Sequence, residues 1–457
     1  MTWSLPELLR ATGARLLQWG PGPFRGVSTD TRTLAAGDVF VALTGPNHDG
    51  HEFAGAAVEA GATAALVSRD RPPPDDAVAW LRVTDGLEAL GDLAAARRQR
   101  LPAMIVGVTG SNGKTTTKEM IAAVLAASGA KVARSAGNEN NLVGVPRTLL
   151  RLEGDEDFVV VEMGMNHAGE IWRLAEIARP DVGVITNVGP AHLEGLGSLE
   201  NVAAAKGELA LAMSSRATLV VNASDPRVAR IGEQFHGRAL HAANGGPVRS
   251  IGARAAGDGT QRMTLEIAGK TIEVRLRAVG AHNVTNALLA ATVGVSFGLS
   301  PETIAAGLER FAPPPMRLEI VRLPGGALVW NDAYNANPAS VEAALAALAA
   351  EPASRRVAVL GEMWELGDEA PRWHRRIGRL AAEWKVDWVV AVGRLAEETV
   401  AGARETGLPP SRTDVCATPE AAVERLAGEL RRGDLVLIKG SRAARLETIA
   451  RALGEKG

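Results

Sequence analysis

The chain has little of several features that mark particular classes of protein. Cys416 is its only cysteine, so no internal disulfide can form, and a reducing cytoplasm is the expected setting. No apolar run is long enough to span a bilayer, and the first residues lack the basic region and apolar core of a signal peptide. A net charge of −2 gives no support for nucleic acid or an anionic membrane as a partner. We therefore expect a cytoplasmic globular protein, and a monomer.

Lysine is also scarce, because only 8 of the 50 basic residues are lysines and the rest are arginines. A lysine inside a sequence motif therefore carries more information here than in an average protein. Lys114, Lys206 and Lys439 all lie in such places.

A length of 457 residues is too great for one hydrophobic core and predicts two to four domains. We expect three, at residues 1–100, 101–312 and 313–457, with Pro313-Pro314-Pro315 as a stiff hinge before the last. Short apolar runs alternate with helical stretches, which predicts an α/β fold with mainly parallel sheets. The third segment looks Rossmann-like but lacks the G-x-G-x-x-G fingerprint, so its fold alone supports no dinucleotide site.

The expected strands lie at 39–43, 64–67, 104–109, 131–134, 157–163, 182–186, 217–221, 327–331, 356–360, 387–392 and 434–438, with a hairpin near 262–277. The expected helices lie near 53–60, 118–127, 287–295, 338–350, 371–384, 394–406, 418–431 and 442–453.

The most informative stretch runs from Gly107 to Thr117, between a buried strand and a helix. A glycine-rich turn that leads into a helix presents backbone N–H groups and the positive end of the helix dipole to a phosphate. Lys114 would reach the terminal phosphates, and the Thr115 hydroxyl would hold Mg²⁺. The strict phosphate-loop pattern needs glycine where Val108 stands, so an ordinary glycine turn with a surface lysine is the alternative.

Glu162 follows the buried run 159–161, at the carboxyl end of a strand, where ligands bind in open α/β sheets. A carboxylate there costs free energy unless a cation pairs with it. Mg²⁺ on the phosphates of ATP would be such a cation. A capping or salt-bridged glutamate is the alternative.

His192 lies just past another strand, in a Gly/Pro loop, with Glu194, Lys206 and Glu208 further along the chain. A loop histidine can be a metal ligand or an ordinary surface residue. An ammonium repels Mg²⁺, but a lysine amine kept neutral by desolvation can take up CO₂ and become an anionic carbamate. Lys206 is therefore either a solvated helix lysine or a carbamate ligand.

Asn283 and Asn286 open an apolar helix, where asparagines usually cap but can also bind an adenine edge. The string from Asn331 to Pro338 follows a strand and holds Tyr334, the only tyrosine; a plain polar turn is the alternative to a binding loop. Arg317 could be a surface charge or a phosphate clamp. The stretches 361–367 and 439–442 also follow strands, and composition does not say what they bind.

These motifs occur together and in order over nearly the full length, and the chain resembles the Mur ligase family. The resemblance rests on the loop 109–115, Glu162, His192, Lys206, the helix start at 282–286 and Arg317, and on the longer strings 161–171, 187–194, 331–338, 365–367 and 439–442. In the first segment, the strings 28–32, 37–40 and 49–53 resemble the family's UDP-binding domain. Glu362 and Trp364 stand where Asp and a smaller residue are expected, and Ala443 to Glu447 lack the expected methionines.

The resemblance implies a three-domain, ATP-dependent amide ligase of peptidoglycan synthesis. It would join D-alanyl-D-alanine to the free carboxylate of a UDP-N-acetylmuramoyl tripeptide through an acyl phosphate and a tetrahedral intermediate. One Mg²⁺ would lie on Thr115 and Glu162, and a second on Glu162, His192 and carbamylated Lys206. Lys114, Glu162, His192 and Lys206 would form the catalytic set.

The resemblance also assigns binding residues. ATP would be held by Thr109, Gly110, Ser111, Asn112, Gly113, Lys114, Thr115, Thr116, Asn283, Asn286, Arg317 and Asp332. The substrates would be held by Ser28, Asp30, Arg32, Asp49, His51, Asn138, Asn140, Asn141, Tyr334, Asn335, Asn337, Glu362, Lys439 and Ser441.

Three other functions stay open from the sequence. The chain could add the third residue of the stem peptide, or it could be a polyglutamylating ligase, although neither is expected to carry the string 334–337. It could also be a nucleotide-dependent switch with the ligase fold but no turnover. The presence of Lys114, Glu162, His192 and Lys206 speaks against a switch.

Overall fold

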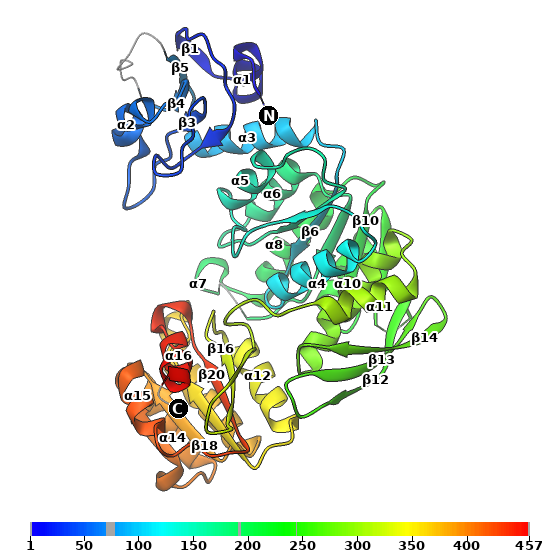
Figure 1. The fold of residues 1–457 in the computed structure, drawn as a ribbon, viewed down its shortest axis with the longest axis vertical. Helices are drawn as coiled ribbons and strands as arrows, with labels where there is room; N and C mark the ends of the chain where they lie inside the picture. The colour runs from blue at the N-terminus through cyan, green and yellow to red at the C-terminus, as the bar shows by residue number, and fades with distance from the viewer. Residues whose placement is uncertain (1, 70–77, 191–192, 244, 456–457) are drawn as a thin grey trace. The chain divides into compact units, whose positions relative to one another are not determined.

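A computed structural model describes residues 2–69, 78–190, 193–243 and 245–455, and it contains three α/β parts (Figure 1). The residues 1–109, 130–183 and 208–218 form one compact unit, and 110–129, 184–207 and 219–457 form a second. We refer to them as unit 1 and unit 2, and we describe each by itself. The domain boundaries expected near residues 100 and 312 remain predictions. None of the described helices combines the length and the apolarity needed to cross a bilayer.

The N-terminal part holds a five-stranded sheet in the order β1-β5-β4-β3-β2. Only β1 runs antiparallel to its neighbour. Its elements are α1 (Leu5–Thr12), β1 (Arg15–Gln18), β2 (Val27–Ser28), β3 (Val39–Val41), the 3₁₀ helix η1 (Gly50–Phe53), α2 (Ala54–Glu59), β4 (Ala64–Val67), β5 (Ala79–Arg82) and α3 (Gly86–Arg98). Ser4 and Glu7 form a capping box at the start of α1, and Asp85 caps α3.

The middle part holds a nine-stranded sheet in the order β14-β13-β12-β11-β10-β9-β6-β8-β7. Its strands are β6 (Met104–Thr109), β7 (Val132–Arg134), β8 (Phe158–Glu162), β9 (Val182–Ile185), β10 (Thr218–Asn222), β11 (Arg238–Ala242), β12 (Val248–Ala255), β13 (Gln261–Ile267) and β14 (Lys270–Leu276). Its helices are α4 (Lys114–Ala126), α5 (Gly144–Leu150), α6 (Glu170–Ala178), α7 (Leu193–Leu196), α8 (Leu199–Ala212), α9 (Pro226–Gln234), α10 (Ala281–Ser296) and α11 (Pro301–Arg310). The expected hairpin is β13–β14, and it is antiparallel.

The C-terminal part holds a six-stranded sheet in the order β15-β16-β20-β17-β18-β19, with β15 antiparallel to β16. Its strands are β15 (Glu319–Arg322), β16 (Leu328–Asp332), β17 (Arg355–Leu360), β18 (Trp388–Val392), β19 (Thr413–Cys416) and β20 (Asp434–Lys439). Its helices are α12 (Pro338–Ala350), η2 (Gly367–Glu369), α13 (Ala370–Glu383), α14 (Ala396–Glu405), η3 (Pro410–Arg412), α15 (Pro419–Leu426), η4 (Arg442–Ala444) and α16 (Glu447–Glu455).

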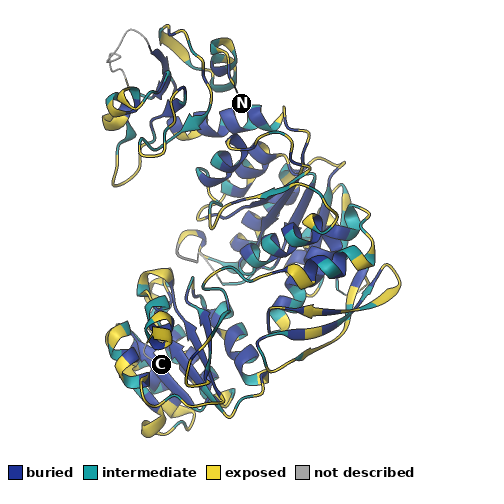
Figure 2. Ribbon diagram, in the orientation of Figure 1, coloured by how far each residue is buried: buried dark blue, intermediate teal, exposed yellow. Residues whose placement is uncertain are grey.

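The central strands of the C-terminal sheet, β17, β18 and β20, are largely buried, as Figure 2 shows. Because side chains alternate along a strand, Val357 and Val359 pack in one apolar cluster, whereas Ala358 and Leu360 pack in the other. Near-continuous apolar runs of this kind are typical of parallel strands covered by helices on both sides.

Four helices differ from their expected bounds by more than two residues at one end. The helix expected over 287–295 begins at Ala281, and local backbone geometry explains the other three differences. The helix expected from 118 begins at Lys114, because Gly113 takes a left-handed conformation and starts it. The helix expected over 418–431 ends at Leu426, and Gly428 follows with a φ of +81°. The helix expected from 442 begins at Glu447, because Arg445 takes a left-handed conformation after η4.

Candidate active site

The glycine-rich turn lies where the sequence predicts it, between the end of β6 at Thr109 and the start of α4 at Lys114. The N–H groups in the first turn of a helix have no partner within the helix and point toward its N-terminus. The Lys114 ammonium folds over the turn and donates to the carbonyls of Gly110 at 2.8 Å and Ser111 at 3.2 Å. Thr109 and Thr115 are buried, and Thr116 is half-buried. This arrangement suits an anion at the N-terminus of α4.

The turn is braced by the residues after β9, which the sequence analysis did not assign to the site. The N–H of Ser111 donates to the Asn187 carbonyl at 2.9 Å, and the N–H of Asn112 donates to Asn187 Oδ1 at 2.9 Å. Thr186 Oγ1 in turn donates to the Asn112 carbonyl at 2.6 Å. The signal available in the sequence was a pair of polar residues directly after a buried strand.

Two of the turn's glycines sit where no other residue fits. Gly110 has a φ of +146°, and a Cβ placed there would lie 1.9 Å from Thr186 Oγ1. Gly113 has a φ of +78°, and its Cβ would lie 2.5 Å from Asn286 Oδ1. The phosphate loop therefore depends on glycine at these two positions, although it departs from the strict pattern at Val108.

Replacing Gly110 with alanine is expected to lower kcat/KM for ATP by about a hundredfold, because a shift of about 1 Å in a phosphate-binding loop is enough for such a loss. The steric cause is the clash with Thr186, whose hydroxyl braces Asn112. Steady-state phosphate release measures the effect. Gly252→Ala is the matched control, because a Cβ there meets nothing within 4 Å, and an equal loss in both variants would contradict the assignment.

The two asparagines of α10 do not cap it, because its first residue follows Gly280 and no side chain bonds the helix start. Both are buried, and each donates its amide inside the protein: Asn283 to the carbonyl of Val279 at 2.9 Å, and Asn286 to Asn283 Oδ1 at 3.0 Å. Thr117 lies in the first turn of α4, directly after the phosphate loop, and its hydroxyl donates to Asn286 Oδ1 at 3.2 Å. The asparagines therefore lie next to the phosphate loop.

Arg317 lies over the ring of Tyr334, with 4.1 Å between the guanidinium carbon and the ring centroid. Its neighbours Met316 and Leu318 have φ values of +59° and +52°, a conformation that non-glycine residues rarely adopt. Backbone strain of this kind concentrates at binding sites, which favours the phosphate-clamp interpretation over a plain surface charge.

The loops after β16 and β20 are joined by an ion pair and by hydrogen bonds. The Lys439 ammonium lies 2.6 Å from Asp332 Oδ2 and donates to the carbonyl of Asn335 at 3.0 Å. Asp332 Oδ1 also accepts from the N–H of Leu318 at 3.2 Å. Asn337 starts α12 and donates to Asn112 Oδ1 in the phosphate loop at 2.8 Å. In unit 2, the structure thus brings together residues predicted for ATP and residues predicted for the substrates.

The loop after β17 is tied to the same edge of the sheet. Ser441 Oγ accepts from the N–H of Trp364 at 3.1 Å and donates to the Ala336 carbonyl at 3.3 Å. Glu362 Oε1 accepts from the N–H of Arg394 at 2.8 Å and from its Nε at 3.2 Å. These bonds set the backbone of the loop and leave the Trp364 side chain 52% exposed.

His374, which the sequence analysis did not single out, holds the start of the loop after β17 in place by a hydrogen bond. Its Nε2 accepts from the N–H of Met363 at 3.1 Å, so Nδ1 carries the proton and donates to the Ala370 carbonyl at 2.7 Å. Burial lowers the pKa of His374 below its usual value, so the ring is neutral at pH 7. No spacing pattern in the sequence marks such a residue.

In unit 1, Glu162 is buried at the end of β8, as the sequence predicts. Its Oε1 accepts from Asn140 Nδ2 at 2.8 Å, and its N–H donates to Ser135 Oγ at 3.1 Å. The structure thus joins a predicted metal ligand to a predicted substrate residue. Asn141 Oδ1 accepts from the N–H groups of Val143 and Gly144 at the start of α5, and Asn138 is exposed.

The predicted UDP-binding residues form two local groups in the N-terminal part. Ser28 Oγ accepts from the N–H of Asp30 at 3.2 Å, and Asp30 pairs with the exposed Arg32 at 2.6 Å. The Arg32 guanidinium lowers the pKa of Asp30 to about 2. His51 is buried and bonded through Nδ1 to Asp49 at 2.6 Å, which lowers the pKa of that carboxyl.

Two further predicted residues lie in or near the segment after β9. His192 is outside the described residues. Lys206 is fully buried in α8, which excludes the solvated helix lysine. Glu208, two residues further, accepts from the N–H groups of Gly169 and Trp172 at 2.7 and 3.1 Å and so caps α6.

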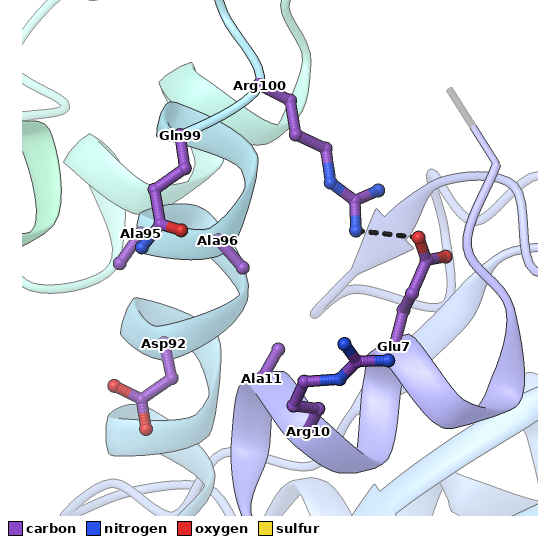
Figure 3. A pocket seen from close by; sticks show the side chains of 8 residues that line it. All are labelled: Glu7, Arg10, Ala11, Asp92, Ala95, Ala96, Gln99 and Arg100. Carbon is purple, nitrogen blue, oxygen red and sulfur yellow. Dashed lines mark hydrogen bonds and ion pairs between the residues drawn. The ribbon is translucent and has the colours of Figure 1, made fainter.

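A cavity of about 540 Å³ lies between α1 and α3 (Figure 3). The Glu7 carboxylate and the Arg100 guanidinium pair across it at 2.9 Å, and Arg10, Asp92 and Gln99 also line it. None of the predicted site residues lines this cavity. It does not form part of the candidate active site.

Three family profiles match the chain along its length. Residues 23–98 match "Mur ligase family, catalytic domain", residues 108–294 match "Mur ligase middle domain", and residues 316–442 match "Mur ligase, glutamate ligase domain". The structure is also similar to that of MurF from Acinetobacter baumannii, with a TM-score of 0.91, 32% identity and coverage of 100% and 99% of the two chains.

Two more comparisons agree with this result. The chain is 38% identical over 439 residues to the UDP-N-acetylmuramoyl-tripeptide--D-alanyl-D-alanine ligase of Escherichia coli K12, covering 94% of each protein. MurF ligase from Thermotoga maritima, solved in complex with ADP, has a TM-score of 0.85, 28% identity and coverage of 94% and 97%. The chain therefore belongs to the Mur ligase family.

Proposed function

We propose that this chain joins D-alanyl-D-alanine to the terminal carboxylate of a UDP-N-acetylmuramoyl tripeptide, with conversion of ATP to ADP and phosphate. The observation that carries the proposal is the Gly-Lys-Thr loop, which hydrogen bonds to Asn187 hold in place. The chain that contains it is 38% identical to the UDP-N-acetylmuramoyl-tripeptide--D-alanyl-D-alanine ligase of Escherichia coli K12, over 94% of its length. The product would be the pentapeptide precursor of peptidoglycan, made in the cytoplasm.

A carboxylate is a poor electrophile, so the reaction needs activation by ATP. A carboxylate oxygen of the tripeptide attacks the γ-phosphorus, the bond to the β-phosphate oxygen breaks, and ADP leaves. The amine of the dipeptide then attacks the acyl carbon and loses a proton, and phosphate leaves from the tetrahedral intermediate. Lys114 lies at the turn that would receive the γ-phosphate. Its ammonium would neutralise the negative charge that moves with the phosphoryl group.

Apart from Thr109, the residues that would hold the nucleotide belong to unit 2. The helix start at Thr115 and Thr116 would hold the phosphates, and Arg317 would clamp them. Asp332 would accept from the ribose hydroxyls once its bond to Lys439 is exchanged. Adenine recognition at Asn283 would likewise require its hydrogen bond to the Val279 carbonyl to be exchanged, and Asn286 would stay bonded to Asn283.

Mg²⁺ would be held by Thr115 and Glu162, and a second ion by Glu162, His192 and Lys206 as a carbamate. The hydroxyl and carboxylate oxygens of this set suit a hard cation, and the buried amine of Lys206 suits it only after carbamylation. Bound there, Mg²⁺ would supply positive charge to the phosphates. The substrate residues of units 1 and 2 would hold the UDP and peptide portions.

The test measures phosphate release from ATP and Mg²⁺ with UDP-muramoyl tripeptide, with and without D-alanyl-D-alanine, and weighs the products by mass spectrometry. We expect a pentapeptide that forms only when the dipeptide is present. Turnover with a UDP-muramoyl dipeptide and a diamino acid, or with a folate, would move the chain to another branch of the family. Nucleotide binding without any turnover would favour a switch.

A further inference from the structure

A chain of hydrogen-bonded side chains runs through the interior of unit 2. It starts at Thr117 in α4, whose hydroxyl donates to Asn286 Oδ1 at 3.2 Å. Asn286 Nδ2 then donates to Asn283 Oδ1 at 3.0 Å, and Asn283 Nδ2 lies 3.2 Å from His282 Nε2. The two asparagines and Thr117 are buried, so the first two bonds form away from water, whereas His282 is half-buried.

The direction of the last bond is fixed by its neighbours. Asn283 Nδ2 also donates to the carbonyl of Val279 at 2.9 Å, so this nitrogen is the amide donor. His282 Nε2 must therefore be the acceptor, and the ring is neutral with its proton on Nδ1. Burial lowers the pKa of His282 to about 4, which agrees with this assignment; Asp332 raises that pKa and Lys439 lowers it.

Each end of the chain lies beside a part of the candidate site. At one end, Asn286 Oδ1 occupies the space that a side chain at Gly113 would need, directly under the start of α4. At the other end, the His282 ring packs against Gly280, whose added Cβ would lie 2.8 Å from His282 Cε1 and 2.9 Å from Ala347 of α12. The Asp332–Lys439 pair lies within electrostatic range of the ring.

We propose that His282 is a positioning residue for nucleotide binding, a role that rests on the proposed function. It acts through Asn283 and Asn286. Its neutral ring supplies the acceptor that ends the chain of hydrogen bonds, and this chain holds Thr117 and the glycine turn in the arrangement that receives the phosphates. His282 thereby links the phosphate loop to α12 and to the Asp332–Lys439 pair.

The test begins with His282→Phe, which keeps a ring in the space but removes one of the two acceptors of the buried Asn283 amide and leaves only the Val279 carbonyl. We expect the Kd for a non-hydrolysable ATP analogue with Mg²⁺, measured by titration calorimetry, to rise about tenfold, which is about 1.4 kcal/mol. His282→Gln places an oxygen acceptor in reach and is expected to bind within about threefold of wild type. His236→Phe, at an exposed histidine of unit 2, is the control and should not change the Kd.

A double-mutant cycle separates positioning from a general loss of stability. If the chain acts as a unit, Thr117→Val and His282→Phe together weaken binding by less than the product of their separate effects. Multiplicative effects would overturn the proposal, as would equal weakening by His282→Phe and His282→Gln. Because the readout is binding of the ATP analogue alone, it decides this proposal even if no pentapeptide forms.

Discussion

Replacing Lys114 with methionine is expected to lower kcat/KM for ATP about a thousandfold, within the range found when a charged group that stabilises a phosphoryl transition state is removed. The ammonium lies over the turn at 2.8 Å from the Gly110 carbonyl, and methionine keeps the length of the side chain without its charge. The measurement is the initial rate of phosphate release over a range of ATP concentrations. We expect kcat to fall more than KM rises, because the charge matters most while the phosphoryl group moves.

Two further variants sharpen this prediction. Lys131→Met removes a lysine of a surface ion cluster with Glu153 and Asp155 and should leave the rate unchanged. Lys114→Arg keeps the charge but exchanges a compact ammonium for a planar fork, and we expect it to recover only a small part of the rate. A rate for Lys114→Met within tenfold of wild type would show that the loop binds phosphate without this ammonium.

Much of the fold could be predicted because its central strands are buried on both faces. The apolar runs at 104–109, 356–360 and 434–438 became β6, β17 and β20 with bounds that differ by one residue at most. The strands that the sequence analysis missed include β1 and β15, which lie at sheet edges and are exposed or half-buried. Exposed edge strands carry mixed polar and apolar residues, so no run or alternation marks them.

The candidate site divides in a similar way. The residues that sit at strand ends, such as Glu162 and Lys439, could be found because polarity after a buried strand is a local signal. The residues that brace them could not, because their partners are distant in sequence: Thr186 bonds Asn112, and Ser441 bonds Trp364. Only folding brings such pairs together, so a single sequence holds no pattern for them.

Lys206→Ala is expected to lower the rate of pentapeptide formation about a thousandfold, because a metal site that loses one anionic ligand loses several kcal/mol of charge stabilisation. Lys206 is fully buried in α8, and burial favours the neutral amine over the ammonium. Uptake of CO₂ by the neutral amine turns the side chain into a carbamate, whose oxygens suit Mg²⁺. Steady-state rates at saturating ATP measure the loss.

Chemical rescue decides which charge the Lys206 position must supply. Formate or acetate, added to Lys206→Ala, places a carboxylate in the space left by the side chain and should restore part of the rate. Methylammonium is the matched control, because it would rescue the variant only if the native group were an ammonium. Rescue by methylammonium alone, or full activity of Lys206→Ala without any additive, would rule out the carbamate. Rescue by the small carboxylates would mean that the lysine at position 206 supplies a negatively charged metal ligand. The sequence alone does not reveal this role.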